Sequence, residues 1–478
     1  MNSGRAPRSA RARVGPAPNR VAAASERLPV WPGVVTAALV GAVYLAVGSG
    51  GTFRFGPSAF PHHILIADAW LHGQLHIRDA VLQQLNEPHY RRYRAGLEGR
   101  YRAQGRQLTE EEWRRIRPTL KTPLMHDWSV VDGKYYGYWG PTTAALLLPY
   151  VAVAGVEASD RLAGAVWGTL GAFFVYLMLR EAGRRHVVPV TPAAAAMLVV
   201  LFGLGTVHFY LAVSGQVWFL SQVVAALFLT LAMWTVLRAD RAWWWAALSG
   251  AAFGLCVLAR SSELTTAPFF LFALVATVGG VGATRRRALT RLALAFAIPL
   301  AGAGAMQLWY NQARFGSPFE DGVRTQLASG ANPRFKRDYD EHGMFSFAYV
   351  PRNAYYYFVN PMLRRHPSTG AITFDPFGNS VFLISPALLY VLRSWRRRNT
   401  FVVGAWAGVV GCLATLLCFF GTGWYNFGNR YLLDLMPLAI LLVAAGMGGR
   451  LTRVSLLLIG LSILANAWGT YRFGMEQG

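Results

Sequence analysis

The sequence has few charged residues and very few cysteines. Only 14% of its 478 residues are Asp, Glu, Lys or Arg, whereas 54% are apolar. So small a charged fraction leaves too little polar surface to cover a soluble protein of this size. The three cysteines, Cys256, Cys412 and Cys418, all fall inside apolar runs, which argues against a disulfide framework or a cysteine metal site. We therefore expect much of the surface to face lipid.

Acidic residues are scarce beside basic ones, with 23 Asp and Glu against 46 Lys and Arg. Arginine occurs largely in short clusters between apolar runs, as orientation in a membrane requires, so we expect no nucleic-acid partner. The sequence also lacks a nucleotide-phosphate motif, a zinc-ligand spacing and a Ser/His/Asp signature. No cofactor is indicated, and a need for a divalent metal stays open.

Long apolar runs fill most of the chain. Runs of roughly 16 to 24 residues, about the length that crosses ~30 Å of hydrocarbon, recur along it. They predict an all-α polytopic membrane protein with about 11–12 transmembrane helices. The candidates lie near Val30–Val47, Pro141–Val156, Leu162–Leu179, Val187–Gly205, Val217–Leu237, Ala242–Leu258, Leu264–Val281, Leu292–Leu308, Ser380–Leu392, Phe401–Phe420, Tyr431–Gly446 and Val454–Trp468.

Arginine clusters predict the orientation of these spans, because basic residues near span ends stay in the cytoplasm. The clusters at Arg180–Arg185, Arg238–Arg241, Arg285–Arg287 and Arg393–Arg398, together with a disordered basic tail over 1–29, place the N-terminus in the cytoplasm. Residues 30–478 then form a single transmembrane domain with two large extracytoplasmic loops, 51–140 and the cap loop 311–379.

The segment Pro141–Val156 conflicts with this alternation of sides. It is short and interrupted by Pro149, so we predict that it dips into the membrane or lies along the interface, leaving eleven spans and an outer C-terminus. The alternative is that the cluster Arg180–Arg185 breaks the charge rule.

The first outer loop holds two candidate acids. Asp68 lies in a mainly apolar amphipathic stretch, 60–75, with His72 on the same helical face. A carboxylate there suits a general base, although it could equally cap or orient. Asp127 is a second candidate. We expect Asp132-Gly133 to form a hairpin turn between short strands.

A strongly charged insertion, 90–121, interrupts the same loop. Glu and Arg alternate along it, which predicts a helical insertion on the surface. Such a segment is either a solvated helix pair or a surface for anionic lipid headgroups or an acidic polymer.

Three arginines, Arg260, Arg314 and Arg430, lie at predicted outer ends of spans, against the general charge pattern. Planar guanidinium groups suit phosphate oxygens, and a lipid phosphate lies at this depth. The alternative for each is snorkelling or pairing, with Glu263, Glu320 and Asp434 respectively. Three such residues on one side favour an anionic headgroup.

The segment 421–431 combines glycines with aromatic and polar residues. Aromatic rings stack on sugars and amides read hydroxyl groups, which makes Trp424, Tyr425, Asn426 and Asn429 candidate sugar or acceptor contacts. An interfacial aromatic belt explains the rings alone but not the asparagines.

This layout resembles the GT-C membrane glycosyltransferases, nearest to bacterial proteins related to protein O-mannosyltransferases and aminoarabinose transferases. The resemblance rests on one span, a long outer loop that opens with the Asp68 helix, then many spans, and on Asn311–Phe319 and Arg430–Pro437.

The resemblance implies transfer of a sugar from a polyprenyl-phosphate donor to a glycan or protein acceptor at the outer face of a bacterial cytoplasmic (inner) membrane. It implies Asp68 as the base or as an orienting group for the acceptor. Many relatives have an Asp-Glu pair in that helix, whereas here Ala69 follows Asp68, so Asp127 or His63 are alternative catalytic residues.

Two other classes of function remain open at this stage. A transporter or lipid flippase needs a polar path through the bundle, and few ionisable residues lie within the spans. A non-catalytic partner in envelope polysaccharide assembly is the third reading.

Overall fold

The computed structural model describes residues 28–120, 126–330 and 333–477, and these are mostly helical. The predicted disordered tail over 1–29 lies almost wholly outside the described residues, as does Lys121, the last residue of the predicted charged insertion.

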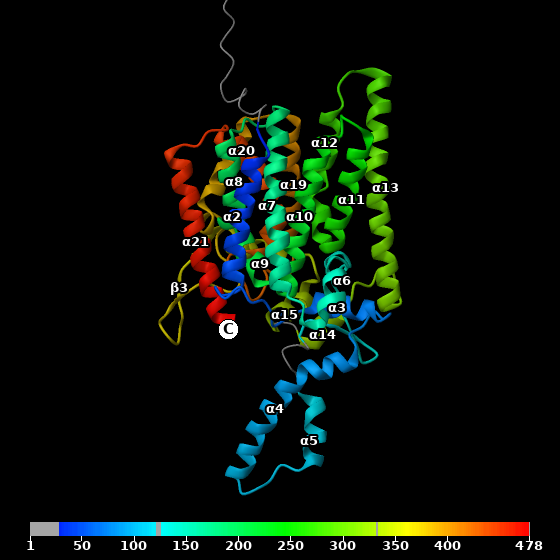
Figure 1. Ribbon diagram of the computed structural model, residues 1–478, viewed down its shortest axis with the longest axis vertical. Helices are drawn as coiled ribbons and strands as arrows, with labels where there is room; N and C mark the ends of the chain where they lie inside the picture. The colour runs from blue at the N-terminus through cyan, green and yellow to red at the C-terminus, as the bar shows by residue number, and fades with distance from the viewer. Residues whose placement is uncertain (1–27, 121–125, 331–332, 478) are drawn as a thin grey trace, which may run out of the picture.

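Long apolar helices make up the body of the protein (Figure 1). In the described part of the chain, seven helical segments are long and apolar enough to cross a membrane, and a pair bent by 56° forms an eighth. This confirms an all-α polytopic membrane protein. The seven are α2 (Trp31–Gly48), α7 (Asp160–Arg184), α10 (Val217–Val236), α13 (Gly282–Phe315), α19 (Thr400–Cys418), η9 with α20 (Arg430–Met447) and α21 (Arg453–Gln477); the bent pair is α8 (Pro192–Leu204) and α9 (His208–Ser214).

Fewer helices meet this length than the eleven or twelve predicted. Two of the predicted spans form helices that are too short to meet it, α11 (Trp243–Ala259) and α12 (Pro268–Thr277). The candidate over 380–392 divides into α17 (Val381–Ile384), η7 (Pro386–Leu389) and α18 (Tyr390–Arg393), because Pro386 cannot continue the hydrogen bonding of α17.

The segment predicted to dip forms α6 (Thr142–Ala154) and the short turn η3 (Gly155–Glu157). At 1.5 Å per residue, α6 reaches about 20 Å, less than the ~30 Å of a bilayer core. Gly155 ends the helix with φ of +59°. The C-terminus lies at the end of the body that also carries α3 (His62–Leu71) and α6 (Figure 1).

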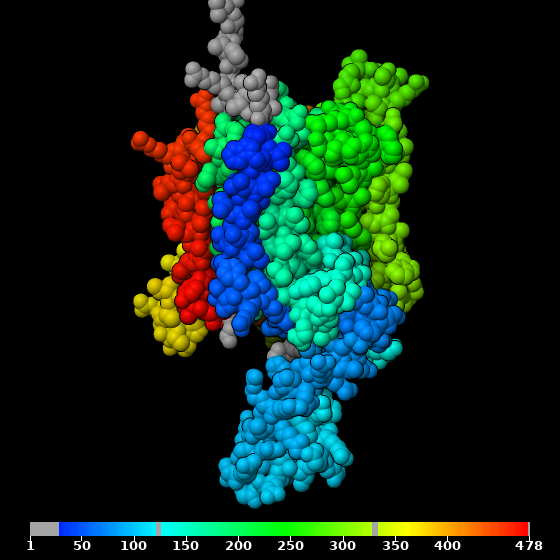
Figure 2. All heavy atoms as spheres, in the orientation of Figure 1, coloured from blue at the N-terminus to red at the C-terminus, as the bar shows by residue number. Residues whose placement is uncertain are grey.

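The charged insertion forms an arm that projects from the body (Figure 2). It consists of α4 (Asp79–Ala103), α5 (Glu110–Ile116) and η1 (Arg117–Thr119). Arg117 connects η1 to α4. It pairs with Glu87 at 3.1 Å, and its guanidinium carbon lies 4.8 Å from the ring centre of Tyr90. Thr109 and Glu112 cap α5 reciprocally.

Short strands and short helices make up much of the two long loops, 51–140 and 311–379. In the first loop β1 (Ser129–Val131) pairs antiparallel with β2 (Lys134–Tyr136), and Asp132 and Gly133 turn between them with φ of +51° and +73°. The predicted hairpin turn is confirmed. The second loop holds α14 (Val323–Gly330), α15 (Pro333–His342), η5 (Phe347–Tyr349), α16 (Val350–Ala354), η6 (Tyr355–Val359) and the hairpin of β3 (Arg364–Arg365) with β4 (Ile372–Thr373).

The spans differ in how much of their surface is buried inside the protein. The most apolar stretches of α10 and of η9 with α20 are each 89% buried, whereas that of α13 is 11% buried. Polar side chains on α10 and η9 are therefore shielded from lipid, and the candidate site lies where these two segments meet.

Candidate functional site

Arg430, the first residue of η9, is buried and forms no ion pair with any residue that the structure describes. Only 5% of it is exposed, and its guanidinium carbon lies 5.8, 5.5 and 5.1 Å from the ring centres of Trp218, Phe219 and Tyr431. Its Nε has no hydrogen-bond acceptor, and no carboxylate of the described residues pairs with it. Because an unpaired buried charge is costly, this arrangement suits an anion that arrives with a ligand.

The preceding loop creates the space for this side chain. Gly423 has φ of +95°, and a Cβ there would lie 3.0 Å from Arg430 Nε, so glycine suits both the backbone and the space. Asn426 Oδ1 accepts the backbone N–H of Arg430 at 3.2 Å and fixes the start of η9. The glycine-rich segment thus positions the arginine.

Arg260, at the end of α11, contacts the ring of Tyr431, as Arg430 does. Its guanidinium carbon is 4.9 Å from the ring centre of Tyr431, and its Nε donates to both oxygens of Asp434 at 2.7 Å. Ser262 Oγ also donates to Asp434, at 2.8 Å. Asp434 therefore pairs with Arg260, although the sequence suggested it as the partner of Arg430.

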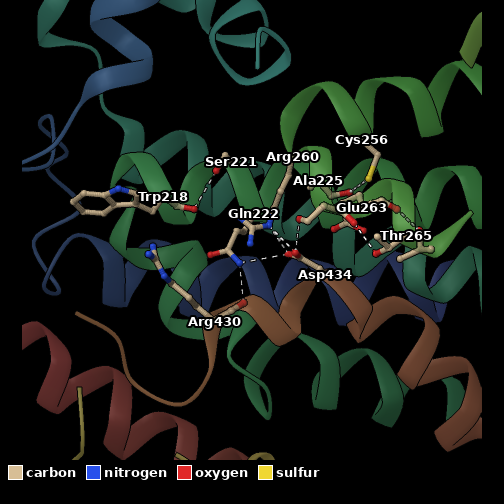
Figure 3. Close-up of polar contacts among 12 residues, drawn as sticks. Trp218, Ser221, Gln222, Ala225, Cys256, Arg260, Glu263, Thr265, Arg430 and Asp434 are labelled. Carbon is tan, nitrogen blue, oxygen red and sulfur yellow. Dashed lines mark hydrogen bonds and ion pairs between the residues drawn. The ribbon is translucent and has the colours of Figure 1, made fainter. Parts of the chain in front are cut away.

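Gln222 of α10 connects the two arginines (Figure 3). Its Nε2 donates to the backbone oxygen of Arg430 at 2.8 Å and approaches Asp434 Oδ1 at 3.5 Å. Figure 3 shows Arg260, Gln222, Asp434 and Arg430 in one polar group, in which all but the half-buried Arg260 are buried. This group holds two guanidinium groups, one directly after the end of α11 and one at the start of η9.

The different pairing of the two arginines predicts different effects on stability. Arg260→Gln leaves Asp434, whose side chain is 1% exposed, as a buried charge without its partner, and we expect a loss of about 3–5 kcal/mol. Thermal unfolding in detergent measures it. Arg430→Gln is the matched control, because it removes a guanidinium that has no carboxylate, and its unfolding temperature should change little. Equal losses in both variants contradict the assigned pairing.

Asp127 hydrogen-bonds Trp218, one of the three aromatic residues around Arg430. Its Oδ2 accepts from Trp218 Nε1 at 2.7 Å, and its Oδ1 accepts from Gln326 of α14. The indole of Trp218 thus carries Asp127 at its N–H edge and Arg430 near its face. Burial raises the pKa of the neighbouring Tyr138 well above its usual range, with the charge of Asp127 adding to the effect.

Asp68 lies in a different place. Arg78 holds its carboxylate with two hydrogen bonds, of 2.7 and 2.8 Å. The two residues line a cavity of about 460 Å³ together with His72, Val151 and Val156. The side chains that bond Asp68 are not those that surround Arg430. The structure therefore separates the two candidate acids, and Asp127 is the one that shares a contact residue with Arg430.

His63 is buried in α3 and is a poor proton acceptor near neutral pH. Its Nε2 lies 3.2 Å from the backbone oxygen of Val217, and burial lowers its pKa to about 3. His62 beside it stacks on Trp128 with ring centres 4.3 Å apart, and burial lowers its pKa to about 3 as well. Both histidines are neutral at physiological pH.

Arg314 does not lie with Arg430 and Arg260. Its Nη1 donates to the backbone oxygens of Gly137 and Trp139, and its Nη2 to Asn311 Oδ1 at 2.9 Å. These bonds fasten the loop before α6 to the end of α13. Glu320, its suggested partner, accepts instead from the backbone of Gly322. The structure thus gives Arg314 a fastening role that differs from the predicted phosphate contact.

The two predicted asparagines also bond the protein itself. Asn426 Nδ2 donates to Pro376 O at 2.7 Å, and Asn429 Nδ2 donates to two backbone oxygens of the cap loop at 2.8 and 2.6 Å. Tyr425 packs against Phe473. Trp424 is 40% exposed and lies against Phe377, and it is the most exposed of the four residues.

Sequence reasoning missed Trp218, Gln222 and Gln326. The first two lie in an apolar run that was interpreted only as a span, and Gln326 lies in the cap loop. A glutamine inside a span is uncommon and offered a signal for Gln222. In the described residues, no group of three or more His, Cys, Asp or Glu side chains is placed to hold a metal ion.

Comparison with known proteins gives matches to solved structures alone. No family model and no curated protein sequence matches the chain. An oligosaccharyltransferase of Archaeoglobus fulgidus in the apo form matches with 13% identity and a TM-score of 0.49 over 93% of this chain and 56% of that one. The AglB oligosaccharyltransferase of the same organism, in complex with an inhibitory peptide and a dolichol-phosphate, matches with 13% identity and a TM-score of 0.45 over 92% and 55%.

The chain thus spans just over half the length of these two proteins. Because both TM-scores are below 0.5, the assignments that follow rest on the contacts of this chain.

Proposed function

We propose that the protein is a membrane glycosyltransferase of GT-C type that moves a sugar from a polyprenyl-phosphate donor to an acceptor hydroxyl. The observation that carries this proposal is Arg430, a buried guanidinium that pairs with no carboxylate of the described residues, contacts three aromatic rings and is linked through Trp218 to Asp127. A phosphate supplies the missing negative charge and hydrogen-bond acceptors. The aromatic rings around it exclude water and strengthen that interaction.

The same residues account for an inverting transfer. Asp127 takes the proton of the acceptor hydroxyl as its oxygen attacks the anomeric carbon of the sugar. The bond between that carbon and the phosphate oxygen breaks, and the electron pair leaves with the polyprenyl phosphate. Arg430, supported by Arg260, stabilises the negative charge that develops on the leaving phosphate.

Asp127 fits the role of base better than Asp68 does. Each oxygen of its carboxylate accepts a hydrogen bond from one neutral donor, Oδ2 from Trp218 and Oδ1 from Gln326. When one oxygen takes a proton, the bond to the other oxygen can remain, and no ion pair with a cationic side chain such as Arg78 is broken. Protonation of Asp68 would break its two-bond ion pair with Arg78. Under this proposal Asp68 orients α3 through Arg78.

The arginine clusters between spans support an outer location for the site. The first outer loop supplies Asp127, and the cap loop supplies Gln326 through α14. With the basic clusters in the cytoplasm, both loops face outward, at the outer surface of a bacterial cytoplasmic membrane. A polyprenyl donor in the outer leaflet then brings its phosphate to the depth of Arg430.

Transfer from radiolabelled polyprenyl-phosphate sugars tests the proposal. The purified protein in lipid nanodiscs is incubated with a panel of such donors and with extracted envelope glycans and proteins as acceptors. We expect label to move to an acceptor with at least one donor. Folded protein that transfers no label from any donor, but moves labelled lipid across a vesicle membrane, contradicts the enzyme assignment and favours a flippase.

A further inference from the structure

A second polar group lies where α7, α10 and α11 meet, at their ends far from Arg430. Its centre is Glu181 of α7, whose side chain is 1% exposed. Arg241 bonds its Oε1, Arg238 Nε lies 3.6 Å from its Oε2, and Arg185 Nε lies 3.9 Å from its Oε1. We call these four residues the Glu181 cluster.

Positive charge exceeds negative charge around this cluster. Arg180 and Arg184 add two guanidinium groups, and Asp240, paired with Arg185, adds one carboxylate. Five guanidinium groups thus face two carboxylates in the part of the chain that the structure describes. Burial, followed by repulsion from Arg241, lowers the pKa of Arg238, and Arg180 and Arg184 contribute to that repulsion.

The arginines of the cluster also have unused hydrogen-bond donors. The Nε atoms of Arg185 and Arg238 are buried without a hydrogen-bond acceptor among the described residues. A buried donor without an acceptor is costly, and more so when it is charged. An anion with several oxygen acceptors would relieve both the unused donors and the excess charge.

Aromatic and apolar surface adjoins the cluster on the lipid side. The Arg238 guanidinium carbon lies 4.9 Å from the ring centre of Trp234 and 4.3 Å from that of Trp245. Trp244 stacks on Trp245 and is 46% exposed, and Leu248 one turn further along α11 is 40% exposed. Tryptophan is enriched at the headgroup level of membranes, so this surface offers a place for an acyl chain below a headgroup.

We propose that the Glu181 cluster, together with the neighbouring Arg184, binds the headgroup of an anionic phospholipid, with its phosphate on Arg238 and Arg184 and an acyl chain along Trp244 and Leu248. The exposed apolar surface beside the charges favours a lipid over a free phosphate. This site is separate from the proposed transfer site and does not depend on its function.

Lipid titration followed by native mass spectrometry tests the proposal with the full chain in neutral detergent. Wild-type protein should bind dioleoyl phosphatidylglycerol at least tenfold more tightly than dioleoyl phosphatidylcholine. The double variant Arg184→Gln/Arg238→Gln should lose most of this preference. The matched control Arg286→Gln/Arg287→Gln removes two exposed arginines at the start of α13 and should keep it.

The single variant Arg184→Gln tests the proposal if the double variant fails to fold. Arg184 is exposed and has no ion pair among the described residues, so Arg184→Gln should fold normally and bind phosphatidylglycerol about fivefold more weakly. Equal weakening in the α13 control shows a diffuse charge effect and overturns the site. Displacement of the lipid by equimolar inorganic phosphate shows a free-anion site and overturns the lipid assignment. No preference for the anionic lipid in wild type overturns the proposal altogether.

Discussion

Replacing Arg430 with glutamine should lower sugar transfer by about 10²–10³-fold, the usual loss when one preorganised donor to a developing negative charge is removed. Glutamine keeps a polar hydrogen-bonding group on a shorter side chain but carries no charge to neutralise a phosphate. Because Arg430 has no carboxylate partner among the described residues, its loss should leave folding intact. The measurement is the initial rate of transfer from the polyprenyl-phosphate sugar, with the unfolding temperature recorded on the same sample.

Two variants calibrate that result. Arg430→Lys retains the charge but loses the planar fork, and we expect it to recover only part of the rate. Arg365→Gln removes an exposed arginine of β3 and should transfer sugar at the wild-type rate. Near-normal transfer by Arg430→Gln would remove Arg430 from the mechanism.

Replacing Asp127 with asparagine should lower transfer by about 10²–10⁴-fold, the usual contribution of a general base. The amide has nearly the same shape and its oxygen can still accept from Trp218, so the loop before β1 should keep its conformation. Its oxygen cannot take the acceptor proton in the transition state. Under this assignment the maximal rate falls while the donor concentration at half-maximal rate changes little, because the donor phosphate contacts Arg430 instead.

Asp68→Asn is the comparison that distinguishes the two acids. It removes the charge that Arg78 holds with two hydrogen bonds, so we expect a lower unfolding temperature and a smaller loss of rate than in Asp127→Asn. If Asp68→Asn abolishes transfer in folded protein while Asp127→Asn stays active, the base is Asp68 and the role given to Asp127 is wrong.

Features set by local sequence were predictable. Apolar runs identify membrane helices because each must span a fixed thickness of hydrocarbon. The dipeptide Asp132-Gly133 predicts its turn because both residues tolerate a positive φ. Arg430 was predictable as an unusual residue, since a cation at the outer end of a span breaks a general pattern.

Features set by contacts between distant segments were not predictable. Arg260 bonds Asp434, 174 residues away, and Trp218 bonds Asp127, 91 residues away. Arg314 looks like Arg430 in the sequence, but backbone oxygens at Gly137 and Trp139 take up its donors. Composition and spacing name candidate side chains, whereas the packing of the helices decides which donors stay free.

The central claim is that Arg430 holds the phosphate of a polyprenyl donor, and a cryo-EM structure of the protein with a bound polyprenyl phosphate tests it most directly. The account predicts phosphate oxygens within hydrogen-bond distance of the Arg430 guanidinium, with Tyr431 and Trp218 beside them. A phosphate found instead on Arg78, in the cavity beside Asp68, would contradict the account and transfer the donor site to that cavity.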